Sequence, residues 1–221
     1  MNIPFTREEF LAVFAEYNLA VWPAPLVLSA LALAAVAFAL MPRPNGSSRV
    51  AAVLLAALWL WAGAVYHAKF FTALSPAGYL FAALFVAQTA LIVRVAFVSR
   101  HLSFAPAWSA GGVAGAVLMV YALILYRATG LMIGHLYPAS PTFGVPCPVT
   151  IFTFGLMLWA RPSFPRVLLV IPTLWAAVGT VAALQLGMVE DYALPVAAAL
   201  GWLFTPYRAT TVRRTSAPHA A

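Results

Sequence analysis

Charged residues are so widely spaced in this chain that the uncharged gaps between them measure its helices. The gaps contain 26, 19, 24, 26, 33, 23 and 16 residues, and in chain order they separate Glu16 from Arg43, Arg49 from Lys69, Lys69 from Arg94, Arg100 from Arg127, Arg127 from Arg161, Arg166 from Glu190 and Asp191 from Arg208. A charge is costly in the hydrocarbon of a bilayer, and a spanning helix needs about 20 apolar residues. The spacing therefore predicts an all-α polytopic membrane protein with seven transmembrane helices.

Composition supports a membrane protein and excludes several other classes. Of the 221 residues 64% are hydrophobic and only 8% are charged, whereas soluble domains carry about 25% charged residues. This excludes a soluble globular domain, a disordered chain and a nucleic-acid-binding protein. The single cysteine also excludes an internal disulfide.

The chain divides into three predicted regions. An amphipathic surface helix is expected over residues 1–18, because Phe10, Val13, Phe14 and Tyr17 share one helical face. A seven-helix transmembrane domain follows over residues 19–207, and a polar cytoplasmic tail over residues 208–221. The predicted spans are 19–42, 50–70, 76–98, 104–129, 148–160, 166–187 and 191–206.

The distribution of positive charge predicts the orientation of the bundle. If seven spans are assumed, one side of the membrane holds nine cations and no acids: Arg43, Arg49, Arg94, Arg100, Arg161, Arg166, Arg208, Arg213 and Arg214. The other side holds three cations and all five acids: Arg7, Lys69, Arg127, Glu8, Glu9, Glu16, Glu190 and Asp191. The positive-inside rule then places the C-terminus in the cytoplasm and the N-terminus outside. The arginines of the inner face would contact anionic membrane lipid.

The longest gap contains an unusual segment, residues 130–148, which is rich in glycine and proline but carries no acid, lysine or arginine. Such residues interrupt helices, yet an apolar loop is not expected to float in water, so we expect it to dip into the bundle. Pro148 suits the first position of the next helix. A helix over residues 148–160 is about 20 Å long, which is too short for a full span. Its positive end would face an outward cavity beside Cys147.

Five residues predicted to lie on the outer side form a candidate metal site: His67, His135, Cys147, Glu190 and Asp191. A thiol, imidazoles and carboxylates are ligands for zinc or another thiophilic metal. Three further residues are expected to line the ligand cavity: Glu16, Tyr66 and Thr150. No compact metal-binding motif such as CxxC or HExxH is present.

Each of these residues also has a structural interpretation. Cys147 and His67 would then be packing or interfacial residues, and His135 would stabilise its loop by a hydrogen bond. Asp191 would be the N-cap of the last helix, and Asn18 would cap the first span. Gly111 and Gly115 form a GxxxG motif, which indicates close helix packing, either within the chain or in an oligomer.

Three functions are compatible with this pattern. The first is a membrane protein that binds or transports a small ligand or a soft metal ion through Cys147 and nearby His and acidic residues. The second is a metal-dependent hydrolase that acts on lipid, in which a bound metal activates water. The third is a non-catalytic sensor or scaffold. Lys69, the only lysine, lies outside the last span, which excludes a conventional retinal Schiff base.

Several strings resemble those of a known family: NIPFTREEF, WLWAGAVYH, PTFGVPCPVTIFTFG, LLVIPTLWAAVG and VEDYALPVAA. Together they are similar to a family of bacterial integral membrane proteins that is described as a domain of unknown function. The resemblance covers nearly the whole chain, and PTFGVPCPVTIFTFG is its most specific part. It implies a multi-pass protein of the bacterial inner membrane and assigns no catalytic residue.

Overall fold

The chain folds into a bundle of helices. The computed structural model describes residues 3–41, 46–98, 103–161 and 165–205. Its α-helices are α1 Arg7–Ala20, α2 Ala24–Leu40, α3 Gly46–Trp61, α4 Ala77–Val98, α5 Ala110–Val120, α6 Tyr126–Met132, α7 Pro146–Met157, α8 Val167–Leu186 and α9 Ala193–Phe204. The remaining elements are the π-helical η1 Ala62–Phe70 and η3 Tyr121–Leu125, the 3₁₀-helical η2 Phe71–Ala73 and η4 Val189–Tyr192, and the two antiparallel strands β1 Ser103–Phe104 and β2 Ala160–Arg161.

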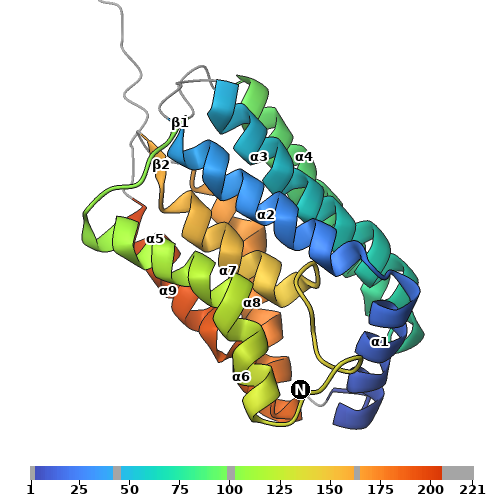
Figure 1. Cartoon of the computed structure of the whole chain (residues 1–221). Coiled ribbons are helices and arrows are strands. Elements are labelled where there is room, and N and C mark those ends of the chain that lie inside the picture. Colours follow the sequence, from blue (N-terminus) through green and yellow to red (C-terminus); the bar gives the residue numbers. More distant parts are fainter. Residues whose placement is uncertain (1–2, 42–45, 99–102, 162–164, 206–221) are drawn as a thin grey trace, which may run out of the picture.

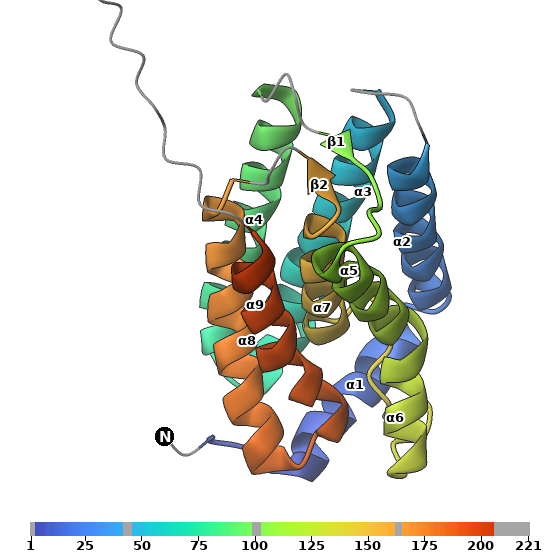
Figure 2. The same ribbon diagram turned by 90° about the vertical axis from the view of Figure 1, so that its left-hand side faces the viewer.

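The short helix α7 is the centre of the bundle. It packs against α3, α5, α8 and α9 (Figures 1 and 2), and all 12 of its residues are buried. A helix that is apolar on every side is expected in such a place, because a surface helix would show a polar face. The predicted start at Pro148 is close to the observed start at Pro146, so Cys147 lies within the first turn of the helix.

Fewer helices are long enough to cross a membrane than the charge spacing predicts. Within the described part of the chain, four stretches qualify by length and composition, and the pair α1–α2, which is bent by 85°, would make a fifth. Each predicted span overlaps a helix, but the count of seven spans is not supported. The reason is length: α7 and α9 have 12 residues each, or about 18 Å, against a hydrocarbon core of about 30 Å.

Helix α1 lies across one end of the bundle (Figure 2). It begins with a capping box, in which Thr6 Oγ1 accepts from the Glu9 backbone N–H and Glu9 accepts from the Thr6 N–H. Its apolar face, which includes Phe10 and Phe14, packs on aromatic residues of η1 and η2 such as Tyr66. The surface helix expected over residues 1–18 therefore corresponds to a helix with one buried face.

The two glycines of the GxxxG motif face different helices of the same chain. A Cβ atom on Gly115 would lie 2.7 Å from the backbone oxygen of Gly155 in α7, and one on Gly111 would lie 3.1 Å from Phe204 Cβ in α9. Both glycines therefore make close helix contacts inside the bundle. The tail predicted over residues 208–221 lies outside the described residues.

Candidate functional site

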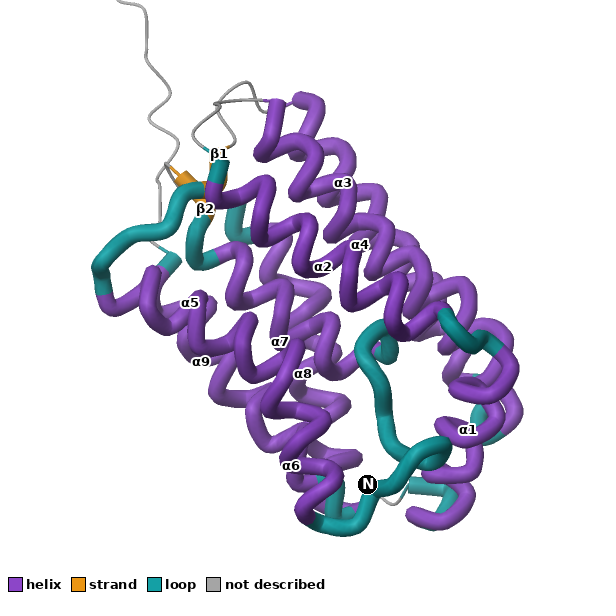
Figure 3. Tube along the Cα trace, viewed as in Figure 1, coloured by secondary structure: helices purple, strands orange, loops and turns teal. Residues whose placement is uncertain are grey.

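The loop between α6 and α7 delivers Cys147 into the interior. It runs from α6 past α1 and then turns into the bundle (Figure 3), and residues 140–157 are buried without interruption. Asn18 of α1 holds the loop. Its side-chain amide donates to the backbone oxygens of Pro138, at 2.7 Å, and of Ser140, at 2.8 Å, and it accepts from Thr142 Oγ1 at 2.7 Å. The prediction that Asn18 caps the first span is wrong, because its side chain is needed here.

Gly144 allows the loop to turn where it enters the bundle. Its φ of +108° is a backbone conformation that residues other than glycine rarely adopt, and a Cβ at this position would collide with Leu28 Cδ1. The turn places Cys147 beside Asp191 of η4. The carboxyl of Asp191 accepts from Tyr126 Oη at 2.5 Å, and burial together with the nearby Asp191 charge raises the pKa of the Cys147 thiol. Three residues that are distant in sequence thus form one buried polar cluster.

Asp191 is not the N-cap of the last helix. The 3₁₀ helix η4 precedes α9, whose N-cap is Tyr192, and no side chain caps it. Asp191 is buried and faces the bundle interior instead. The helix-capping interpretation failed because an acidic residue before an apolar run looks the same whether the next helix starts at once or after one tight turn.

Glu190 points to a second polar cluster at the same end of the molecule. Its Oε1 lies 2.7 Å from His135 Nδ1, and Arg7 Nη2 lies 2.7 Å from His135 Nε2. Arginine can only donate, so Nε2 accepts and Nδ1–H donates to the carboxylate. The imidazole therefore connects the guanidinium of α1 to a buried carboxylate of η4. Glu190 is fully buried, and its other oxygen, Oε2, has no partner among the described residues.

His67 lies apart from both clusters. Its ring packs against five aromatic rings, the closest being Phe85 at 4.7 Å and Trp175 at 4.8 Å between centroids. Neither nitrogen has a hydrogen-bond partner within the described part of the chain. The segment around it, η1, is π-helical, a form that occurs frequently at functional sites.

The five predicted metal ligands thus lie in three places: Cys147 with Asp191, His135 with Glu190, and His67 alone. Across residues 3–41, 46–98, 103–161 and 165–205, no group of three or more His, Cys, Asp or Glu side chains is arranged to hold a metal ion.

A cavity of about 510 Å³ opens next to the Cys147 cluster. We call it the Cys147 cavity. Its walls are mostly apolar and come from α1, η1, η2, α4, α7 and α8 and from the segment before α1. Its polar lining includes Tyr66, Cys147, Trp175 and Asp191. Tyr66 was expected to line a cavity and does so.

The other two predicted cavity residues lie elsewhere. Glu16 is exposed on α1 and does not line this cavity. Thr150 is buried in α7, where its hydroxyl donates to the backbone oxygen of Pro146 at 2.8 Å. This bond satisfies the hydroxyl within its own helix, which is ordinary for threonine in an apolar helix.

Two polar groups at the cavity lack partners. The hydroxyl of Tyr66 is buried and makes no hydrogen bond to any described residue. The indole N–H of Trp175 is buried beside the Cys147 thiol, a weak acceptor, and makes no hydrogen bond to the described chain either. Buried polar groups are normally satisfied, so unpaired donors in a cavity wall indicate a missing acceptor.

Comparison with known sequences now identifies the family, since one family of sequences matches residues 7–216. The chain belongs to a family of unknown function, DUF6064. No curated protein and no solved structure matches it. The DUF6064 match includes both polar clusters and most of the lining of the Cys147 cavity.

Tyr126 and Trp175 were missed by sequence reasoning at this DUF6064 site. Each is an aromatic residue inside an apolar helix, η3–α6 for Tyr126 and α8 for Trp175, and so each looks like ordinary core packing. Their roles depend on contacts across the fold, such as the bond from Tyr126 to Asp191, 65 residues away. No local signal in the sequence could have indicated them.

The Asp191 carboxyl makes the stability of the fold depend on pH. Burial raises the pKa of Asp191 from 3.8 to about 7, and the charge of Glu190 adds to this, against the hydrogen bond from Tyr126. Between about pH 4 and pH 7 the folded protein keeps a proton that the unfolded chain releases. The free energy of unfolding therefore falls as pH rises through this window, and above it this group causes no further change with pH.

We expect Asp191→Asn to remove this pH dependence. Melting temperatures of wild type and variant would be measured in detergent at about pH 5 and about pH 8. The melting temperature of the variant relative to that of wild type should be higher at about pH 8 than at about pH 5. The other titrating groups are the same in both proteins, so their contributions cancel in the difference between the two melting temperatures. A difference that is constant with pH would contradict the assignment.

Proposed function

We propose that the protein is a membrane protein whose Cys147 cavity binds a small, neutral, mostly apolar ligand that carries an oxygen acceptor. The observation that carries the proposal is the pair of unpaired donors, Tyr66 Oη and Trp175 Nε1, at a cavity that is otherwise largely apolar. Ligand sites are typically apolar pockets of about 300–1,000 Å³ with a few convergent polar groups. A carbonyl or ether oxygen is an acceptor that either donor would bind.

The charge of the site favours a neutral ligand over an anion. Asp191 lines the cavity, and Glu190 precedes it in η4. No arginine or lysine is among the residues that line the cavity. An anionic group would be repelled by Asp191 whenever that carboxyl is ionised, whereas a neutral carbonyl would accept from the two donors at either protonation state.

We also propose that the bundle is a multi-pass protein of the bacterial inner membrane with its N-terminus outside. Four or five helices that are long and apolar enough to cross support a membrane location. The orientation is carried over from the division of the cations, which was counted for seven spans. The Cys147 cavity would then open near the outer face. The soft-metal and lipid-hydrolase hypotheses stay predictions, and the ligand proposal depends on neither.

A tryptophan placed in the cavity provides the main test. Val178→Trp in α8 would narrow the cavity that Val178 lines, whereas Leu184→Trp introduces the same side chain on the same helix at a position that does not line it. Proteins purified in mild detergent would be extracted with organic solvent, and the retained small molecules would be compared by mass spectrometry. We expect a neutral apolar compound in wild type and Leu184→Trp, and its loss from Val178→Trp.

Removing one donor should then weaken binding of that compound without abolishing it. Tyr66→Phe deletes only the hydroxyl, and a lost hydrogen bond of about 1 kcal/mol corresponds to an affinity about fivefold lower. Two results would overturn the proposal. One is retention of the same compounds by wild type, Leu184→Trp and Val178→Trp, and the other is an unchanged affinity for the compound in Tyr66→Phe.

A further inference from the structure

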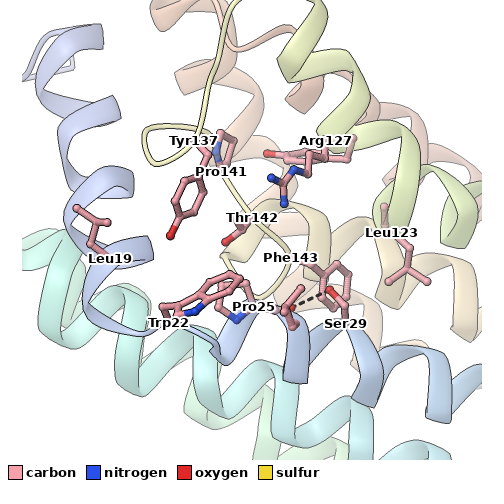
Figure 4. A pocket seen from close by; sticks show the side chains of 13 residues that line it. Leu19, Trp22, Pro25, Ser29, Leu123, Arg127, Tyr137, Pro141, Thr142 and Phe143 are labelled. Atoms are coloured by element: carbon pink, nitrogen blue, oxygen red, sulfur yellow. Dashed lines mark hydrogen bonds between the residues drawn. The ribbon is translucent and has the colours of Figure 1, made fainter.

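A second concave site lies on the side of the bundle, separate from the Cys147 cavity. This lateral groove has a volume of about 730 Å³ and lies between the α1–α2 bend, η3, α6 and the loop before α7 (Figure 4). It shares no lining residue with the Cys147 cavity. Its walls are largely apolar, but one arginine, Arg127 of α6, extends into it toward Thr142.

Arg127 is the only lining residue with a permanent charge, and nothing within the described residues neutralises it. The one ion pair found there joins His135 to Glu190, and Asp191 is occupied by the hydroxyl of Tyr126. A guanidinium in an apolar groove without a carboxylate favours binding of an anion, because phosphate or carboxylate matches its planar set of donors.

The position of the groove along the helices matches the boundary between lipid headgroups and acyl chains. Arg127 lies near one end of the apolar stretch Ala110–Met132, and Leu123 lies one helical turn closer to its middle. Across the groove, Trp22 and Tyr137 pair with their ring centroids 6.3 Å apart, and both are partly exposed. Tryptophan and tyrosine are enriched at this depth of a membrane.

We propose that the lateral groove binds an anionic phospholipid. Its phosphate pairs with Arg127, and an acyl chain lies along Leu123 and Leu26, whose side chain is 56% exposed. A soluble anion would use the guanidinium but would leave these apolar walls in water. The inference rests on the membrane location proposed above and is independent of any ligand in the Cys147 cavity.

The experiment compares lipid retention by two charge variants of the full chain. Arg127→Gln removes the charge in the groove, and Arg94→Gln removes one exposed arginine of α4 that lines neither concave site. Native mass spectrometry in detergent would count bound phosphatidylglycerol and bound phosphatidylcholine with the same acyl chains. We expect wild type and Arg94→Gln to hold one phosphatidylglycerol at least tenfold more tightly than Arg127→Gln does.

Three outcomes would overturn the proposal. Equal retention of phosphatidylglycerol by Arg127→Gln and Arg94→Gln would show that Arg127 does not bind the lipid. If wild type bound phosphatidylcholine as tightly as phosphatidylglycerol, the groove would not require an anionic lipid. Displacement of the lipid by glycerol 3-phosphate at a matched concentration would assign the groove to a soluble phosphate. Since Arg127 is exposed, its replacement should not prevent folding, and circular dichroism would verify this.

Discussion

Replacing His135 by alanine is expected to lower the free energy of unfolding by about 3–5 kcal/mol. Glu190 is fully buried, and its carboxylate accepts from His135 Nδ1–H at 2.7 Å. The imidazole also connects this carboxylate to Arg7 at the start of α1. Without it the Glu190 carboxylate would be buried with no hydrogen bond from the described residues, and the Arg7 guanidinium would no longer be connected to it. The measurement is reversible unfolding by denaturing detergent, followed by the loss of helical circular dichroism.

A double variant distinguishes loss of this pairing from loss of packing. Glu190→Gln replaces the charge by a neutral amide, so His135→Ala should cost much less in that background than in the wild type. The difference between the two costs is the coupling energy of the pair. A cost of His135→Ala that is the same in both backgrounds would show that the imidazole acts only by filling space.

The positions of the helices were predictable from the sequence because charge is excluded from hydrocarbon. Each uncharged gap contains a helix, and the glycine- and proline-rich segment before Pro148 does enter the bundle. The lengths of the helices were not predictable in this way. The gap between Arg127 and Arg161 holds the end of α6, a loop that is buried from residue 140 onward, and α7, and absence of charge does not distinguish a buried loop from a helix.

The candidate site was predictable only in part, for a related reason. Sequence reasoning selected Cys147, Asp191 and Tyr66 by their shared depth, and these three do line one cavity. Depth does not determine which way a side chain points around its helix. His67 precedes Phe71 by one helical turn and follows Tyr66 directly, yet its ring lies among aromatic rings behind the cavity wall. His135 pairs with Glu190, 55 residues away in the sequence, and not with Cys147, and this pairing could not be read from the sequence.

Replacing Gly155 in α7 is expected to have a comparably large effect through packing. Here α5 crosses the central helix so closely that a Cβ on Gly155 would lie 2.7 Å from the backbone oxygen of Gly115 and 3.0 Å from the backbone nitrogen of Met119. Backbone atoms of a packed helix cannot move aside as the end of a side chain can. Gly155→Ala should therefore cost about 1–3 kcal/mol, and Gly155→Leu should prevent the native bundle from assembling.

The reciprocal substitution tests whether one contact is responsible. A Cβ on Gly115 would lie 2.7 Å from the backbone oxygen of Gly155, so Gly115→Ala should be destabilising to a similar degree. Once either alanine has separated the two helices, the second meets less resistance, and the double variant should cost less than the sum. Gly46→Ala is the matched control, because a Cβ there would have no neighbour within 4 Å. Equal stability of Gly46→Ala and Gly155→Ala in denaturing-detergent titrations would contradict a close α5–α7 crossing. Additive costs would indicate two independent contacts, one on each face of the crossing.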